Sequence, residues 1–202
     1  MNTILYLHGF LSSPQSEKAQ QTLAFANQYY PDVQIITPQI PNTIDNAVGY
    51  LRDIVEEHFR QKQKPLLCIG SSMGGFLSTW LLSEYPEDLG GKAVLINPAV
   101  APYNLMQGYL GEHTNPYSNE KFRVDAHHID VLRSLDPSSI CHPERFQVLL
   151  QTGDEVLDYR LAEERYHGAE VKIEQGGDHS FINYGKHLAD IFDFLSDSAR
   201  IA

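Results

Sequence analysis

The sequence predicts an α/β fold, a mostly parallel sheet of about six strands flanked by helices. Three observations indicate this class: short apolar runs of strand length recur along the chain, segments of helical period separate them, and the runs are near-continuous rather than alternating. Near-continuous apolar strands are typical of a parallel sheet that helices cover on both faces. In such a fold the reactive crevice lies beyond the carboxyl ends of the strands.

The individual elements follow from local patterns. The six apolar runs expected to be strands are 4–7, 33–37, 66–69, 93–96, 146–150 and 171–174. Helices are expected between them, including one whose apolar face contains Ala19 and Leu23, one over 44–59 and one over 76–82. Ser13 and Pro14 fit the N-cap and first position of the first helix, and Asp158 fits the N-cap of a helix over 158–166.

The chain is predicted to be one domain, 1–202. With 202 residues and 42% hydrophobic content it is long enough for one compact core and short for two. The segment 101–145 interrupts the strand–helix alternation and is rich in Pro, Asn, Gly, His and Tyr, with one helix expected near 127–135. Long insertions in compact domains are usually lids or binding loops, so we interpret it as a lid over the crevice. The alternative is an irregular surface connection.

Composition excludes several classes of function. The formal net charge of −11 disfavours binding to nucleic acid or to an anionic membrane surface. Cys68 and Cys141 indicate no disulfide framework, and the first apolar run is too short for a signal peptide or a membrane span, so we expect a soluble cytoplasmic protein. No metal is expected, because the adjacent His127 and His128 would point about 100° apart on a helix. No dinucleotide cofactor is expected, since no G-x-G-x-x-G follows the first strand.

A candidate nucleophile lies directly after the third apolar run. Gly70-Ser71-Ser72-Met73-Gly74 matches G-x-S-x-G, which places a serine on a sharp strand-to-helix turn. Such a turn needs small residues on both sides of the serine so that strand and helix approach closely, and Gly70, Gly74 and Gly75 meet this need. We therefore predict Ser72 as the nucleophile.

A serine nucleophile needs a base and a group that orients the base. Asp154 follows the strand at 146–150, and His179 follows a Gly-Gly turn after the strand at 171–174. We predict Asp154 as the acid and His179 as the base. Asp158 competes for the first role but fits a helix N-cap better, and Asp178 is expected to be a loop carboxylate.

Two further sets of residues are expected near the nucleophile. The backbone N–H groups of Met73 and Phe10 are the predicted oxyanion hole, with Leu11 as the alternative to Phe10, because one donor follows the nucleophile and the other follows the first strand. His8 is expected to be a scaffold residue. Aromatic residues of the insertion are candidate substrate contacts, or they pack the lid onto the sheet: Tyr103, Tyr109, Tyr117 and Phe122.

With these motifs in place, the chain resembles the YqiA-type small bacterial esterases of the α/β-hydrolase superfamily. The resemblance runs nearly end to end. It is carried by Tyr6-Leu7-His8-Gly9-Phe10, Ser12-Ser13-Pro14, Gly70-Ser71-Ser72-Met73-Gly74-Gly75, Asn97-Pro98-Ala99-Val100, Asn115-Pro116-Tyr117 and the stretch from Gln151 to Tyr159. Met73 stands where Leu is more usual, which leaves the backbone donor intact.

The resemblance implies an α/β-hydrolase fold and a carboxylic-ester hydrolase in which the Ser/Asp/His triad transfers to Ser72, Asp154 and His179. We expect cleavage of short to medium acyl esters through an acyl-enzyme intermediate. Two alternatives stay open: cleavage of acyl-CoA or other thioesters, and a non-catalytic binding protein on a hydrolase fold. The leading antiparallel strands of larger members are absent from the sequence pattern.

Overall fold

A six-stranded parallel sheet organises the chain, in the order β2-β1-β3-β4-β7-β8. The computed structural model describes residues 3–85 and 89–197, so the two ends of the predicted domain, 1–2 and 198–202, lie outside the described residues. The strands are β1 (Thr3–Leu7), β2 (Gln34–Ile36), β3 (Leu67–Ser71), β4 (Lys92–Ile96), β7 (Phe146–Gln151) and β8 (Glu170–Glu174). All six predicted strands are confirmed.

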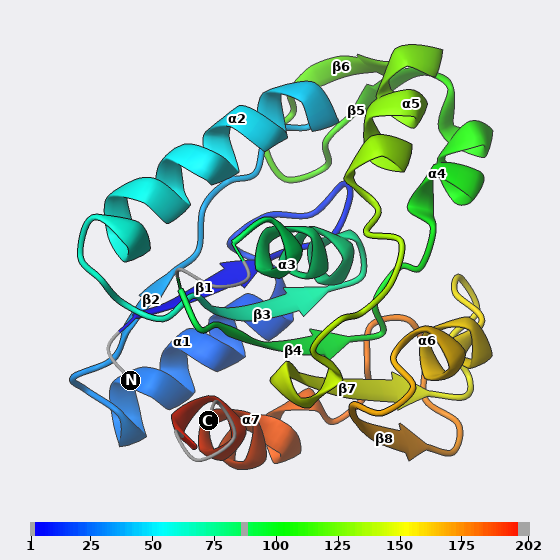
Figure 1. Cartoon of the computed structure of the whole chain (residues 1–202). Helices are drawn as coiled ribbons and strands as arrows, with labels where there is room; N and C mark the ends of the chain where they lie inside the picture. Colours follow the sequence, from blue (N-terminus) through cyan, green and yellow to red (C-terminus); the bar gives the residue numbers. More distant parts are fainter. Residues whose placement is uncertain (1–2, 86–88, 198–202) are drawn as a thin grey trace.

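Helices cover both faces of this sheet (Figure 1). One face carries α1 (Glu17–Tyr29) and α7 (Leu188–Ser196), and the other carries α2 (Ile44–Val55), α3 (Met73–Glu84) and α6 (Tyr159–Arg165). A π turn, Glu56–Arg60, continues α2. Single 3₁₀ turns at Pro143–Arg145 and Tyr184–His187 lead into β7 and α7.

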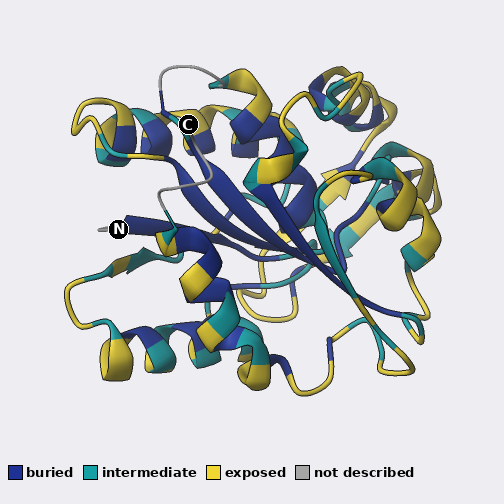
Figure 2. Cartoon of the chain, turned by 60° about the horizontal axis from the view of Figure 1, so that its bottom comes forward, coloured by how far each residue is buried: buried dark blue, intermediate teal, exposed yellow. Residues whose placement is uncertain are grey.

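The covering helices explain why the central strands are apolar over most of their length. Successive residues of a strand point to opposite faces, so Leu5 and Leu7 of β1 enter the core beneath α2 and α3, whereas Ile4 and Tyr6 enter the core beneath α1 and α7. All four are at most 1% exposed. Figure 2 shows buried central strands inside helices whose outer surfaces are exposed, whereas the edge strands β2 and β8 are only partly buried.

The start of α1 corrects a sequence prediction. The N-cap is Ser16, not Ser13, and Pro14 precedes the helix. Ser13 is buried, and its hydroxyl accepts a hydrogen bond from the Gln15 N–H at 3.0 Å while its carbonyl accepts one from the Ser16 N–H at 3.1 Å. Ser13 therefore closes a turn ahead of the helix, an alternative role for serine that local sequence does not separate from capping.

The second predicted N-cap agrees with the structure. The Asp158 side chain accepts a hydrogen bond from the Arg160 N–H at 3.1 Å, and α6 begins at the next residue after Asp158. This pairing satisfies one of the backbone N–H groups that a helix leaves without an internal partner at its start.

The segment between β4 and β7 holds the elements that stand above the carboxyl ends of the strands (Figure 1). These are α4 (Pro102–Leu105), the 3₁₀ turn Met106–Tyr109, β5 (Gly111–Thr114), β6 (Lys121–Val124) and α5 (Ala126–Leu135). The helix expected near 127–135 is present as α5. The antiparallel hairpin of β5 and β6 was not expected, because its residues lack a continuous apolar run.

A buried asparagine holds this hairpin in place. Asn115, 1% exposed, donates hydrogen bonds to the Ser12 carbonyl at 3.2 Å and to Asn42 Oδ1 at 2.7 Å. Its own Oδ1 accepts the N–H groups of Tyr117 and Ser118, at 2.9 and 3.3 Å. The hairpin is thus tied to the loops that follow β1 and β2.

The contact between α3 and β1 generates a testable prediction. A Cβ on Gly74 would lie 1.9 Å from the Leu7 carbonyl oxygen, which belongs to the sheet backbone and cannot rotate away. We expect Gly74→Ala to lower the free energy of unfolding by at least about 3 kcal/mol. Urea unfolding followed by circular dichroism measures the change.

Gly49→Ala is the matched control for this substitution. Gly49 lies in the middle of α2, and a Cβ there would meet no heavy atom within 4 Å. Alanine in a helix interior is favoured over glycine by about 0.8–1.0 kcal/mol, so this variant is expected to gain stability. Equal stability changes in the two variants would contradict the proposed strand–helix clash.

Candidate active site

Ser72 occupies a sharp turn between β3, which ends at Ser71, and α3, which begins at Met73. Its backbone has φ 54° and ψ −121°, a sparsely populated conformation for a residue with a side chain. Two hydrogen bonds hold it: the Ser72 N–H donates to the Ile96 carbonyl, and the Ser72 carbonyl accepts the Ala99 N–H, both at 3.0 Å. The turn therefore presents the hydroxyl at the carboxyl edge of the sheet.

The glycines around Ser72 let the strand and the helix approach closely, as the sequence predicts. A Cβ on Gly70 would lie 2.4 Å from the Gly74 carbonyl oxygen, and a Cβ on Gly75 would lie 2.7 Å from Cβ of Pro98. Side chains at these positions would push α3 away from the sheet. The close approach of strand and helix thus fixes the direction of the Ser72 side chain.

The structure brings the three predicted triad residues together. His179 Nε2 lies 3.1 Å from Ser72 Oγ, and His179 Nδ1 lies 2.8 Å from Asp154 Oδ2 and 3.0 Å from Oδ1. A carboxylate only accepts hydrogen bonds, so the imidazole carries its proton on Nδ1 and accepts the Ser72 hydroxyl proton at Nε2. The Asp154 side chain is 2% exposed, and its Oδ1 also accepts the N–H groups of Val156 and Leu157.

Backbone contacts join the loop that carries Asp154 to the loop that carries His179. The Gly153 N–H donates to the Gly176 carbonyl at 2.8 Å, and the Gly176 N–H donates to Thr152 Oγ1 at 2.8 Å. A Cβ on Gly153 would lie 2.4 Å from the Gly177 carbonyl oxygen. The acid and the imidazole are thus placed relative to each other by backbone contacts and by the Thr152 hydroxyl.

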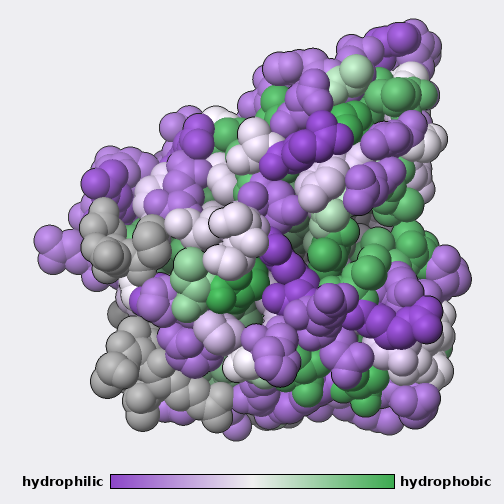
Figure 3. Space-filling model, turned by 45° about the vertical axis from the view of Figure 1, so that its right-hand side comes forward, coloured by the Kyte–Doolittle hydropathy of each residue, from purple (hydrophilic) through white to green (hydrophobic). Residues whose placement is uncertain are grey.

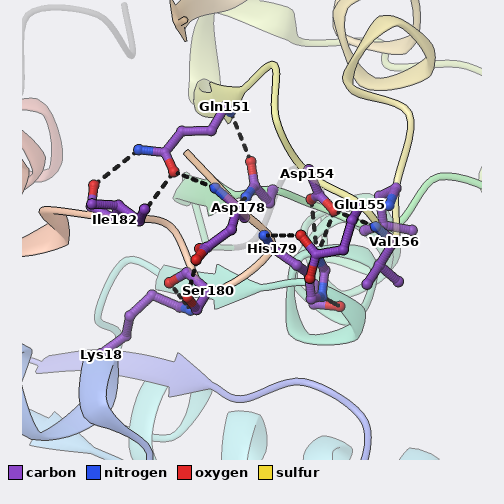
Figure 4. A network of polar contacts seen from close by, with 12 residues as sticks. Lys18, Gln151, Asp154, Glu155, Val156, Asp178, His179, Ser180 and Ile182 are labelled. Atoms are coloured by element: carbon purple, nitrogen blue, oxygen red, sulfur yellow. Dashed lines mark hydrogen bonds and ion pairs between the residues drawn. The ribbon is translucent and has the colours of Figure 1, made fainter. Parts of the chain in front are cut away.

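Two amide side chains that sequence reasoning missed support the histidine loop. Gln151, at the end of β7, accepts the N–H groups of Asp178 and Ile182 at its Oε1 (Figure 4), and its Nε2 donates to the Ile182 carbonyl and to Glu174. A Cβ on Gly177 would lie 2.0 Å from this Oε1, which explains that glycine. Gln151 is 3% exposed and uses all four of its hydrogen-bonding positions.

Asn97 is the second of these amides. Its Oδ1 accepts the Gln151 N–H at 3.0 Å, and its Nδ2 donates to the Asp178 carbonyl at 3.0 Å. It therefore joins the end of β4 to the end of β7 and to the residue before His179. The available signal was a polar amide directly after a buried apolar strand, at the edge where functional groups gather in this type of sheet.

The loop after β1 lies against the candidate nucleophile. A Cβ on Gly9 would come within 3.2 Å of Cβ of Ser72, so the neighbouring Phe10 amide belongs to the same corner of the site. Met73 is the first residue of α3, where a helix leaves N–H groups without internal partners. The roles of Phe10 and Met73 as oxyanion donors stay predictions.

His8 has a structural environment, consistent with a scaffold role. It is 4% exposed, its Nδ1–H donates to the Gly9 carbonyl at 2.9 Å, and its Nε2 accepts the Ile40 N–H at 3.1 Å. Burial lowers the pKa of His8, outweighing the opposite effect of the hydrogen bond to Gly9. The neutral imidazole therefore connects the loop after β1 to the loop after β2.

The four aromatic residues predicted as substrate contacts have different surroundings. Tyr117 lines the crevice that contains Ser72 and is 51% exposed. Tyr109 and Phe122 pack edge-on against the ring of Phe10, with centroid distances of 5.5 and 5.9 Å. The Tyr103 hydroxyl donates to Asp136 at 3.0 Å. Contact with substrate stays a prediction for each of them.

Two cavities meet at the loop after β1. The first, of about 420 Å³, contains Ser72 and His179, and most of the residues that line it carry a hydroxyl, a carboxylate or an ammonium group. The second, of about 50 Å³, is apolar and lies between that loop and the insertion, where Met73, Leu77, Met106 and Leu132 line it. Figure 3 views the side toward which the strands run, where hydrophobic and hydrophilic residues adjoin around a hollow.

Residues 3–85 and 89–197 contain no group of three His, Cys, Asp or Glu side chains placed so as to hold a metal ion. Within the same ranges, no helix has the length and apolar character needed to cross a membrane.

The fold is that of the α/β hydrolases. Mouse alpha/beta hydrolase domain-containing protein 10 superimposes with a TM-score of 0.69 at 18% identity, covering 96% of this chain and 90% of that one. Est1E from Butyrivibrio proteoclasticus, with ferulic acid bound, gives 0.68 at 12% identity over 96% and 88%. The monoacylglycerol lipase of Paleococcus ferrophilus gives 0.65 at 12% identity over 96% and 94%.

Within this class the chain belongs to the family described as "Uncharacterised protein family (UPF0227)", which it matches over residues 3–196. A UPF0227 protein of Shewanella oneidensis is 27% identical over 202 residues, which is 95% of this chain and 98% of that protein. The resemblance to YqiA-type α/β hydrolases is therefore confirmed.

The environment of His8 predicts a pH-dependent component of stability. The pKa of His8 is lower in the folded than in the unfolded chain. At pH values below the ordinary pKa of histidine, the unfolded chain therefore binds more protons than the folded chain. This component of stability is complete above about pH 6.5 and declines below it, by at most about 1.4 kcal/mol per pH unit.

The comparison of wild type with His8→Asn isolates this component from other titrating groups. Urea unfolding at about pH 7.5 and about pH 5.5 should show a larger loss of stability in wild type on acidification than in the variant. Parallel losses in the two proteins would show that His8 does not contribute as described.

Proposed function

We propose that the chain is a serine hydrolase that cleaves carboxylic esters with short to medium acyl chains through an acyl-enzyme intermediate. The observation that carries this proposal is the hydrogen-bonded series from Ser72 through His179 to the buried Asp154. A serine hydroxyl is a weak nucleophile unless a positioned base removes its proton, and this geometry supplies that base.

In the first half of the proposed reaction, Ser72 Oγ attacks the acyl carbon while its proton moves to His179 Nε2. The negative charge that develops on the carbonyl oxygen is stabilised by the N–H groups of Met73 and Phe10. The bond between the acyl carbon and the alcohol oxygen then breaks, and His179 returns the proton to that oxygen. The acyl group stays on Ser72 as an ester.

In the second half, water takes the place of the alcohol. His179 removes a proton from the water, the resulting oxygen attacks the acyl carbon, and Ser72 recovers its proton as the acid leaves. Asp154 stabilises the imidazolium that forms in both halves and keeps the Nδ1–H tautomer. Its N–H partners at Val156 and Leu157 favour the ionised carboxylate.

The size of the apolar cavity supports the lower end of the acyl range. The cavity adjoins Phe10 and Met73, measures about 50 Å³, and is lined by Leu77 on α3 and Leu132 on α5. Because residues of the segment 101–145 line this cavity and the catalytic crevice, we assign the segment the role of a cover over the site.

One structural relative supports an ester substrate rather than another acyl compound, because it is a monoacylglycerol lipase. Thioester cleavage is the second candidate, since a thioester needs the same nucleophile and base. The formal net charge of −11 disfavours an anionic CoA group, so an ester is the first choice. A chain-length series of nitrophenyl esters beside the matching acyl-CoA compounds separates the two.

A fluorophosphonate probe tests whether Ser72 is activated. We expect covalent labelling of wild type, and we expect Ser72→Ala to lose labelling and about 10⁴ to 10⁶ in kcat for nitrophenyl butyrate while staying folded. Ser134→Ala is the control, because that hydroxyl is exposed on α5 and donates to the Val131 carbonyl. A wild-type protein that does not react would favour the non-catalytic binding protein.

A further inference from the structure

The position of His179 determines which cavity receives the alcohol half of the substrate, if the proposed function holds. His179 returns a proton to the alcohol oxygen, so this oxygen and the group attached to it must lie on the His179 side of Ser72. His179 lines the polar crevice and does not line the apolar cavity. The alcohol therefore faces the polar crevice and the acyl chain faces the apolar cavity.

Residues of β1 and of the start of α1 form part of the wall of the polar crevice. Tyr6 of β1, Ser16 at the N-cap of α1 and Lys18 in its first turn all line it. Lys18 Nζ donates to the Ser180 carbonyl at 2.7 Å, next to His179 (Figure 4). An ammonium has three donors, so further hydrogen bonds can be made from it.

Two hydroxyls in this wall lack the partners that buried polar groups normally have. Tyr6 is 1% exposed, and its hydroxyl oxygen and that of Ser16 are shielded from solvent and have only each other as hydrogen-bond partner. A bond between the two leaves one hydroxyl proton and several lone pairs unused. Because buried polar groups are normally hydrogen-bonded, we expect a group of the substrate to use this remaining capacity.

The charges facing the crevice restrict the chemistry of that group. The carboxylates of Glu17, Glu155 and Asp178 line it together with the single ammonium of Lys18. These carboxylates already accept hydrogen bonds from Gln21, the His179 N–H and Ser180, respectively. Three negative groups against one positive group repel an anion, and a quaternary cation would leave the hydroxyls of Tyr6 and Ser16 without partners.

We infer that the Tyr6, Ser16 and Lys18 wall is a leaving-group subsite for a neutral, polyhydroxylated alcohol. Hydroxyl groups both donate and accept, which matches a wall containing hydroxyls, an ammonium and carboxylates. The inference rests on the proposed ester hydrolysis and deepens it, by naming the alcohol half of the substrate as a polyol and the acyl half as a short chain.

A matched pair of esters tests the inference. The compounds 2,3-dihydroxypropyl butyrate and propyl butyrate share an acyl chain and a carbon skeleton and differ by two hydroxyls. We expect wild type to cleave the dihydroxy ester with kcat/KM at least about tenfold higher. Equal values, or a preference for butyrylcholine as a cationic third substrate, would overturn the inference.

Substitutions then assign the preference to the subsite. Tyr6→Phe removes one hydroxyl and keeps the buried ring, and Ser16→Ala removes the other. Each should reduce the ratio of the two kcat/KM values about three- to tenfold, whereas Ser83→Ala, an exposed hydroxyl on α3, should not change it.

The outcomes separate this inference from the proposed function. Variants that lower both kcat/KM values equally would show a structural role for the wall and would overturn the subsite. Cleavage of both esters without any preference would leave the proposed function standing and remove only the inference. Absence of cleavage of every ester, with no fluorophosphonate labelling, would overturn both.

Discussion

The site depends on the close approach of α3 to strands β1 and β3. Backbone meets backbone there, because Gly74 lies against the Leu7 carbonyl and Gly70 lies against the Gly74 carbonyl, with no room for a Cβ on either. This contact forces the chain to reverse within one residue, and Ser72 takes up the reversal in a strained conformation. The position of the Ser72 hydroxyl is thus a consequence of helix–sheet packing.

The other two residues of the triad are placed by a different means. Asp154 and His179 lie on loops, which alone would leave their separation poorly defined. Two buried amide side chains fix the histidine loop, since Asn97 joins the Gln151 N–H to the Asp178 carbonyl and Gln151 accepts the Asp178 N–H. The loop that carries Asp154 is then joined to the histidine loop by the hydrogen bond from the Gly153 N–H to the Gly176 carbonyl.

The sequence predicted the parts of the fold that local chemistry specifies. Continuous apolar runs located all six strands, and the glycine spacing located the turn at Ser72. The hairpin of β5 and β6 escaped prediction because it is stabilised at a distance, through Asn115 and its contacts with Ser12 and Asn42. The role of Gln151 escaped for the same reason, since its partners lie 27 and 31 residues further along the chain.

The most direct test of the account is detection of the acyl-enzyme itself. Protein mixed with nitrophenyl butyrate, quenched in acid and digested, would be analysed by peptide mass spectrometry. We expect a butyryl group on the peptide that carries Ser72, and loss of that adduct in His179→Ala, because the serine then lacks its base. A butyryl group found instead on the exposed Cys141, or hydrolysis without any adduct on Ser72 in single-turnover samples, would contradict it.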